Sequence, residues 1–133
     1  MPDTPPVTPQ GELVIRTIAM PADTNSNGDM FGGWLVSQMD IGGAILARNV
    51  AHSRITTVAI DAMAFHHPVY VGDIVSCHAS LSKTGRTSLR IEVEAWAQRQ
   101  KGGEHVRVTT GTFTYVAIDD RGRPQPVHRS SAP

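Results

Sequence analysis

The chain has 133 residues, enough for one domain that buries roughly two thirds of the surface its unfolded form exposes. Its 12 basic and 12 acidic residues cancel, and aromatic residues make up 5% of the chain, so nothing points to nucleic acid. No apolar stretch reaches the roughly 18 residues that cross a bilayer, and the single cysteine, Cys77, excludes an intramolecular disulfide and fits a reducing compartment. We therefore expect a cytoplasmic protein that binds neither nucleic acid nor membranes.

The chain opens with an arm and a first strand. Residues 1–11 are rich in proline and lack the charged and then apolar run of a signal peptide, so we expect a flexible arm. A strand is predicted from Glu12 to Met20, because apolar residues dominate it and Pro21 ends it. Turn-forming asparagine and glycine residues between Asn25 and Gly28 then separate this strand from the next element.

A helix is predicted from about Gly33 to His52, because this segment contains no proline and many helix formers. On a helical wheel the residues expected to face the core are Leu35, Met39, Leu46 and Val50. A neighbouring flank carries mostly small side chains and is expected to be a pocket wall that a backbone or a slender ligand can approach. Its members are Met39, Asp40, Gly43, Ala44, Ala47 and Ala51.

Asp40 is the unusual residue of this helix. It lies about two turns inside, so it cannot be an N-cap, and no lysine or arginine lies three or four residues away. It is either a solvated carboxylate on an exposed flank or a functional group. Gly32 and Gly33 favour the second alternative, because they leave unshielded N–H groups at the positive end of the helix dipole, where an oxyanion can bind.

Four more strands are predicted after the helix, at 55–66, 74–83, 87–98 and 106–118. The first of these looks covered on both faces, and Trp96 on the polar side of the third indicates that this side is covered at its end. Short connections imply antiparallel neighbours, so we expect an α+β domain over residues 12–120 with one helix across a curved five-stranded sheet. Residues 121–133 are expected to be an irregular tail. One helix cannot cover both faces of such a sheet, which predicts self-association.

The order of elements and several short motifs resemble the hot-dog-fold acyl-CoA thioesterases, within them the short bacterial YciA-like group. The resemblance covers about Leu13 to Pro126, nearly the whole chain. Its most specific parts are Ala19-Met20-Pro21, the N-x-N-G-x-x-F-G-G-W run from Asn25 to Trp34, Ser37-Gln38-Met39-Asp40, and Pro68-Val69 followed by Val71-Gly72-Asp73.

The resemblance implies a hot-dog fold, in which a five-stranded antiparallel sheet wraps one long helix. It implies that two copies pair edge to edge into a double hot dog and that three such dimers form a hexamer. It also implies hydrolysis of acyl-CoA to a free acid and CoA. Carried onto this chain, the acidic residue is Asp40 and its amide partner is Asn25; the family places its sites at the dimer interface, so the two can come from different protomers.

The chemistry expected at this site is attack of water on the thioester carbonyl. Asp40 is the candidate general base, with nucleophilic attack by its carboxylate as a less favoured variant. The N–H groups of Gly32 and Gly33 are the candidate oxyanion donors, and Asn25 would orient the water or the carbonyl. We expect no metal and no cofactor besides the CoA of the substrate, because the histidines and the cysteine lack ligand spacing; His66-His67 is interpreted as a strand end.

A CoA ligand also requires cations for its phosphates. The turn formed by Lys83, Gly85, Arg86, Thr87 and Ser88 offers two positive charges, a flexible backbone and two hydroxyls, and similar turns in the family meet the nucleotide end of CoA. The alternative is an ordinary polar hairpin tip, and Arg54 is a weaker candidate.

Two other functions stay open at this point. An acyl-CoA hydratase or dehydratase on the same fold normally uses a helix histidine, and this helix offers only His52, at its far end. A non-catalytic acyl-CoA sensor would bind without turnover.

Overall fold

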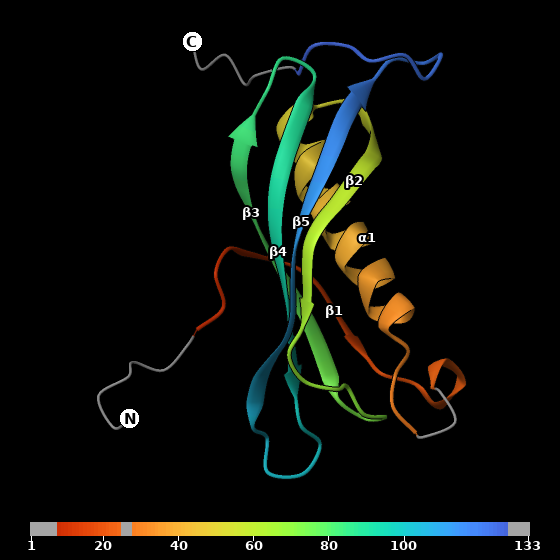
Figure 1. Ribbon diagram of the computed structural model, residues 1–133, viewed down its shortest axis with the longest axis vertical. Coiled ribbons are helices and arrows are strands. Elements are labelled where there is room, and N and C mark those ends of the chain that lie inside the picture. The colour runs from red at the N-terminus through yellow and green to blue at the C-terminus, as the bar shows by residue number, and fades with distance from the viewer. Residues whose placement is uncertain (1–7, 25–27, 128–133) are drawn as a thin grey trace.

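The computed structural model describes residues 8–24 and 28–127 as one helix held by a curled antiparallel sheet (Figure 1). The sheet has the strand order β1-β3-β4-β5-β2, and every pair in it is antiparallel. The elements are β1 (Glu12–Ile18), the 3-10 turn η1 (Pro21–Asp23), α1 (Gly32–Ala51), β2 (Arg54–Phe65), β3 (Ile74–Thr84), β4 (Ser88–Gln98) and β5 (His105–Ile118). The predicted order of elements along the chain is confirmed, with element ends shifted by one or two residues. The expectation that short connections join sheet neighbours was wrong for β2 and β3, because β2 pairs with β5 at the far edge of the sheet.

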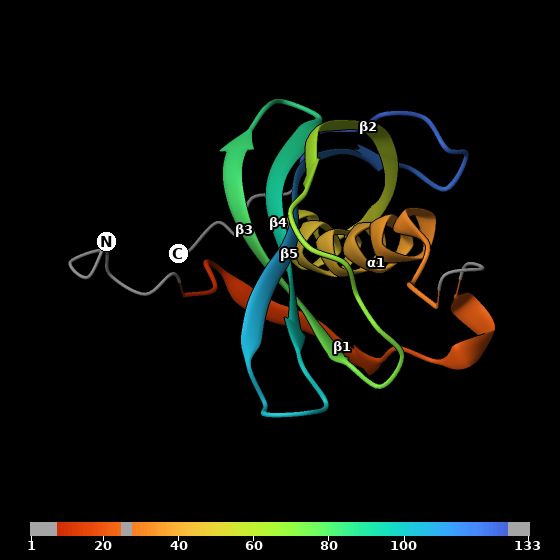
Figure 2. The ribbon, with the colours of Figure 1, turned by 60° about the horizontal axis from the view of Figure 1, so that its bottom comes forward.

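The sheet wraps around α1, which contacts all five strands (Figure 2). The alternation predicted for 87–98 is confirmed, since Leu89, Ile91 and Val93 are buried on the inner face, toward the helix. On the outer face, Trp96 is 5% exposed and its indole N–H donates to Glu94 Oε1 at 2.9 Å, so the cover predicted at that end is confirmed.

The buried face of α1 differs from the predicted one. Leu35 and Met39 are buried as expected, but Leu46 and Val50 are only partly buried. The rest of the buried face is made of small residues: Gly42, Gly43, Ala47 and Ala51. The sheet approaches so closely that a Cβ at position 42 would lie 2.8 Å from Val14 Cγ2. Most of the small flank is therefore packed against strands, and its interpretation as a pocket wall holds only for Ala44, which lines a cavity described below.

Strand β2 forms one edge of the sheet, and the cover predicted for both of its faces is absent from the described chain. Val58 is 55% exposed and Phe65 is 56% exposed. The pairing of β2 with β5 shifts register between Thr57 and Ala59 and again between Asp61 and Ala64. These irregularities bend the strand around α1 and leave an apolar edge open. No helix among the described residues is long and apolar enough to cross a membrane.

Candidate functional site

Asp40 faces the sheet, where two hydroxyl groups bind the same carboxylate oxygen. Thr57 Oγ1 donates to Asp40 Oδ1 at 2.8 Å, and the Tyr115 hydroxyl lies 3.1 Å from Oδ1 and 2.9 Å from the Asp40 carbonyl oxygen. Thr57 and Tyr115 are paired across β2 and β5, so the sheet register brings both to one point of the helix. The alternative of a merely solvated carboxylate was therefore wrong.

The Tyr115 hydroxyl keeps its proton and is always a hydrogen-bond donor in this arrangement. It is fully buried, and burial raises its pKa well above the ordinary value, helped by the negative charge of Asp40 and by the hydrogen bond to it. The phenol therefore stays protonated at any physiological pH. Within the described part of the chain, no donor contacts the second oxygen of Asp40, Oδ2.

The N-terminal end of α1 presents backbone donors. Phe31 is the N-cap in an extended conformation and provides no side-chain cap, and the N–H groups of Trp34 and Leu35 donate to its carbonyl oxygen. The N–H groups of Gly32 and Gly33 precede these and have no partner within the helix. Both glycines are exposed and the first turn carries no acidic side chain, so this end suits a negatively charged oxygen.

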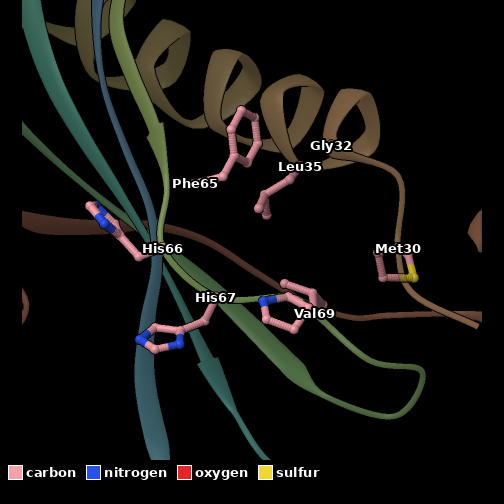
Figure 3. Close-up of a pocket in the computed structure, with 8 residues that line it drawn as sticks. Met30, Gly32, Leu35, Phe65, His66, His67 and Val69 are labelled. Atoms are coloured by element: carbon pink, nitrogen blue, oxygen red, sulfur yellow. The ribbon is translucent and has the colours of Figure 1, made fainter.

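A pocket of about 280 Å³ opens beside these amides (Figure 3). Figure 3 shows the Phe65 ring beside the start of α1, with Leu35 between it and Met30, while the rings of His66 and His67 point away from Leu35. A Cβ at Gly32 would lie 3.4 Å from the Phe65 ring, so the aromatic edge reaches the amide end of the helix. The lining residues are Met30, Gly32, Leu35, Phe65, His66, His67, Pro68 and Val69.

A buried ion pair holds the wall of this pocket. Asp73 is 2% exposed; its Oδ2 accepts from Arg99 at 2.5 Å and from the Tyr70 N–H at 2.9 Å. Arg99 also donates to the carbonyl oxygen of Pro68, at 3.0 Å. The next residue, Val69, accepts a backbone hydrogen bond from Met30 at 2.9 Å. Hydrogen bonds thus hold the loop after β2 both to Arg99, which directly follows β4, and to the segment that enters α1.

The structure does not bring the predicted catalytic groups of one chain together. Asp40 lies about 12 Å along the helix axis from Gly32, at 1.5 Å per residue, and it does not line the pocket beside the amides. A base and an oxyanion donor that serve one carbonyl must each lie about 3 Å from adjacent atoms of the reacting group. Asn25 lies outside the described residues.

A second, open cavity of about 580 Å³ lies between the C-terminal half of α1 and β2. Ala44, one turn beyond Asp40, lines it, and so do two cationic side chains, Arg48 and Arg54. The Arg54 guanidinium lies 3.4 Å from the carbonyl oxygen of Asp120. Arg48 escaped the sequence analysis because an arginine near the end of a helix is common and favourable in itself.

The predicted CoA-binding turn is the hairpin tip between β3 and β4, at the same end of the molecule as the C-terminus of α1 (Figure 1). Gly85 N–H donates to Ser88 O at 2.8 Å and closes the turn. The carbonyl oxygens of Arg86 and Thr87 accept from Val127 and Ala117, which ties the turn to the C-terminal segment. Lys83 and Arg86 are exposed and enter no ion pair among the described residues, so both charges are available to a ligand.

The sequence analysis missed Thr57 and Tyr115. A tyrosine on the buried face of a strand is a usable signal, because its hydroxyl must find a partner. Thr57 gives no such signal, since threonine is an ordinary strand residue. In the described ranges, no three His, Cys, Asp or Glu side chains cluster as metal ligands would. Cys77 is buried, and burial raises its pKa to about 12.

Comparison with known proteins identifies the family. A family model of the thioesterase superfamily matches residues 27–104. The acyl-CoA thioester hydrolase YciA of Salmonella typhimurium is 54% identical over 123 residues, which cover 90% of this chain and 92% of that protein. The chain belongs to the thioesterase superfamily.

Solved structures of the superfamily agree with this fold. A hexameric broad-specificity acyl-coenzyme A thioesterase, studied as an aspartate-to-alanine mutant enzyme, is 48% identical with a TM-score of 0.89, covering 92% of this chain and 90% of that one. A hexameric hotdog-fold thioesterase of Campylobacter jejuni is 40% identical with a TM-score of 0.84, covering 89% of this chain and 91% of that one. The predicted hot-dog fold is confirmed.

Proposed function

We propose that this protein hydrolyses acyl-CoA thioesters to a free carboxylic acid and CoA. The observation that carries the proposal is the carboxylate of Asp40, held by two hydroxyls on a helix whose other end presents unpaired glycine amides. The superfamily and the acyl-CoA thioester hydrolases to which the chain is similar support the same chemistry.

In the proposed reaction, Asp40 takes a proton from water as the water oxygen attacks the thioester carbon. The N–H groups of Gly32 and Gly33 stabilise the oxyanion, and Asn25 orients the water or the carbonyl. Collapse of the intermediate breaks the C–S bond, and the thiolate of CoA leaves and takes up the proton. Side chains and backbone amides supply every group in this scheme, so we propose no cofactor.

Each active site is proposed to combine residues of two protomers. Within one chain the amides and the carboxylate are too far apart to serve one carbonyl, at about 12 Å along the axis. A second copy that pairs along the open β2 edge would bring its helix alongside the first. Two antiparallel helices then place the amides of one copy near Asp40 of the other. The dimer is thus the minimum active unit, and we propose a trimer of dimers, since the similar solved thioesterases are hexameric.

The substrate would extend in two directions from this site. The apolar side chains of Leu35, Phe65 and Val69 in the first pocket suit the acyl chain. The hairpin tip formed by Lys83, Gly85, Arg86, Thr87 and Ser88 would bind the nucleotide end of CoA through its two cations and two hydroxyls. Arg48 and Arg54, which line the open cavity, lie at the same end of the molecule as the hairpin tip. They are further candidates for phosphate contacts.

Release of free thiol from a panel of acyl-CoAs tests the activity. Hydrolysis liberates CoA from every accepted substrate. A hydratase or dehydratase would change the acyl group without freeing the thiol, and a sensor would be stabilised thermally by acyl-CoA without any product. Absence of thiol across the panel would exclude hydrolysis.

Subunit complementation tests the shared site. Asp40→Asn and Gly32→Pro are each expected to inactivate the oligomer, and Pro suits the first helical position, where it removes only the N–H donor. Co-expressed, the two variants should recover about a quarter of wild-type activity if protomers mix randomly, because half of the sites in mixed dimers receive both intact groups. If Asp40 and Gly32 of the same chain served one site, the mixture would stay inactive.

A further inference from the structure

Another cavity, of about 220 Å³, lies on the outer face of the sheet, away from α1. Cys77 of β3 faces the helix, since a Cβ at Gly42 would lie 3.4 Å from Cys77 Cβ. Its strand neighbours Ser76 and His78, which line this cavity, therefore face outward. Figure 2 shows α1 on the inner side of the sheet. The cavity is thus separated by the sheet from the helix that carries the proposed catalytic groups.

Arg16 of β1 supplies the positive charge of this cavity. Its Nε donates to Ser76 Oγ at 2.8 Å, and Ser76 is 8% exposed, so the base of the guanidinium is fixed to the sheet. Within the described chain, no hydrogen bond or ion pair involves the two terminal nitrogens of Arg16. These two nitrogens form a planar fork that fits the two oxygens of a carboxylate.

The carboxylate of Glu94, beside the cavity, is already occupied by other partners. Its Oε1 accepts from the Trp96 indole N–H at 2.9 Å and from the Gln10 N–H at 3.1 Å, and its Oε2 lies 3.8 Å from Arg107 Nη1. Among the described residues that line the cavity, none is acidic. The described lining therefore carries a net positive charge, which Glu94 does not neutralise by a contact to Arg16.

The opposite chemistry is present in the same cavity, because three of its lining residues are apolar or aromatic. They are Pro9, Ile74 and Trp96. At the ~30 Å³ that a water molecule takes in the liquid, the cavity has room for about seven non-hydrogen atoms. A small ligand with one charged end and a short apolar body fits these dimensions and this lining. A phosphate ion would leave the apolar walls without a partner.

We propose that this cavity is a binding site for a short-chain organic acid. The carboxylate binds the terminal nitrogens of Arg16, and the hydrocarbon part packs against Ile74 and Trp96. One charged contact and a few buried carbon atoms predict a dissociation constant on the order of 1 mM. Inorganic phosphate should bind at least about 10-fold more weakly, because it buries no apolar surface. The inference does not depend on the proposed hydrolysis.

Fluorescence titration of Trp96 tests the site. The chain has two tryptophans, so the Trp34→Phe variant leaves Trp96 as the sole tryptophan emitter. Sodium butyrate at constant ionic strength should change this emission saturably, whereas butyramide, which has the same shape without the charge, should not. In this background Arg16→Gln should weaken butyrate binding about 10-fold or more. Arg90→Gln is the matched control, because it neutralises an exposed arginine on the same strand as Trp96 that does not line the cavity.

Saturation-transfer NMR of butyrate is a second readout that does not depend on the emission of Trp96. The signal should fall in Arg16→Gln and persist in Arg90→Gln, while any butyrate in the acyl pocket would contribute equally to both. Equal binding by the two variants in both measurements, equal binding of butyramide and butyrate, or tighter binding of phosphate would each overturn the proposal.

The two proposals of this article fail separately. Neither binding measurement contains acyl-CoA, and thiol release by Arg16→Gln should equal that of the unaltered protein. Loss of the butyrate site would therefore leave the proposed hydrolysis standing. A protein that binds butyrate through Arg16 but releases no thiol from any acyl-CoA would overturn the proposed function alone.

Discussion

The start and the middle of α1 are suited to opposite chemical tasks. At its start, glycines without side chains present N–H donors beside a pocket lined by Phe65. In its middle, Asp40 accepts hydrogen bonds from Thr57 and Tyr115 and keeps one oxygen free of the described donors. One region can stabilise negative charge and the other can accept a proton. Their separation of about 12 Å along the axis means that these two regions of one helix cannot act on the same carbonyl, which is why we propose sites shared between protomers.

Removing the proton acceptor should have the largest effect. Asp40→Asn keeps the shape of the side chain but cannot act as a base, so turnover of acyl-CoA should fall about 10²–10⁴-fold while the oligomer stays intact. The matched control is Glu104→Gln, which neutralises an exposed carboxylate in the β4–β5 loop. This loop lies at the end of the sheet opposite the β3–β4 hairpin tip. Rates come from thiol release and assembly from light scattering. An Asp40→Asn enzyme with the full rate would show that the middle of the helix is not the catalytic region.

Removing a backbone N–H donor at the start of α1 should have the second largest effect. Gly32→Pro deletes one N–H and fits the extended Phe31 before it, so turnover should fall roughly 10²-fold with little change in thermal stability. Gly32→Ala keeps the N–H and places its methyl group in ordinary contact with Phe65, and it should retain most of the activity. Equal losses in the two variants would indicate a steric effect and not an oxyanion donor.

Substitutions in the β3–β4 hairpin tip test whether the nucleotide end of acyl-CoA binds there. Lys83→Ala with Arg86→Ala should raise KM for acyl-CoA about 10-fold and leave kcat unchanged, because the lost contacts bind the ground state and transition state equally. The effect should vanish with a short thioester that lacks the nucleotide, and it should shrink at high salt. Lys101→Ala, an exposed lysine on the opposite loop, is the control. A KM increase for the short thioester as well would exclude a nucleotide contact.

Cys77 lies in the core beside Gly42 of α1 and should affect stability alone. Its thiol loses a proton near pH 9.0 when unfolded and near pH 12 when folded, so unfolding releases a proton within that window. The free energy of unfolding should therefore fall as pH rises above 9, by about 2 kcal/mol at pH 10.5. Cys77→Ala should lack this part of the decline in urea unfolding at pH 8.5 and 10.5, with normal activity at pH 8. Identical slopes for both proteins would contradict the buried thiol.

Much of the site was predictable because its signals are local. Asp40 stood out as a carboxylate inside a helix without a basic neighbour, and the glycine pair marked an open helix start. The strand pattern predicted the elements along the chain and their antiparallel pairing, but not that β2 lies beside β5 and apart from β3. Thr57 and Tyr115 were missed because they meet Asp40 only through the register of β2 on β5, which shifts twice along the pair.

By itself, the sequence determined which segments form strands and helix, where the helix begins, and which charged side chains are unusual, because these depend on periodicity over a few residues. Only the tertiary structure decided what the small side chains of α1 contact. Nothing within the helix shows that Gly42 and Gly43 make room for Val14 and Tyr115, since those partners come from strands far along the chain. Long-range pairing and bulges set the packing of the sheet. They place strands against a helix flank that was expected to face a ligand, and residues of these strands support the Asp40 carboxylate.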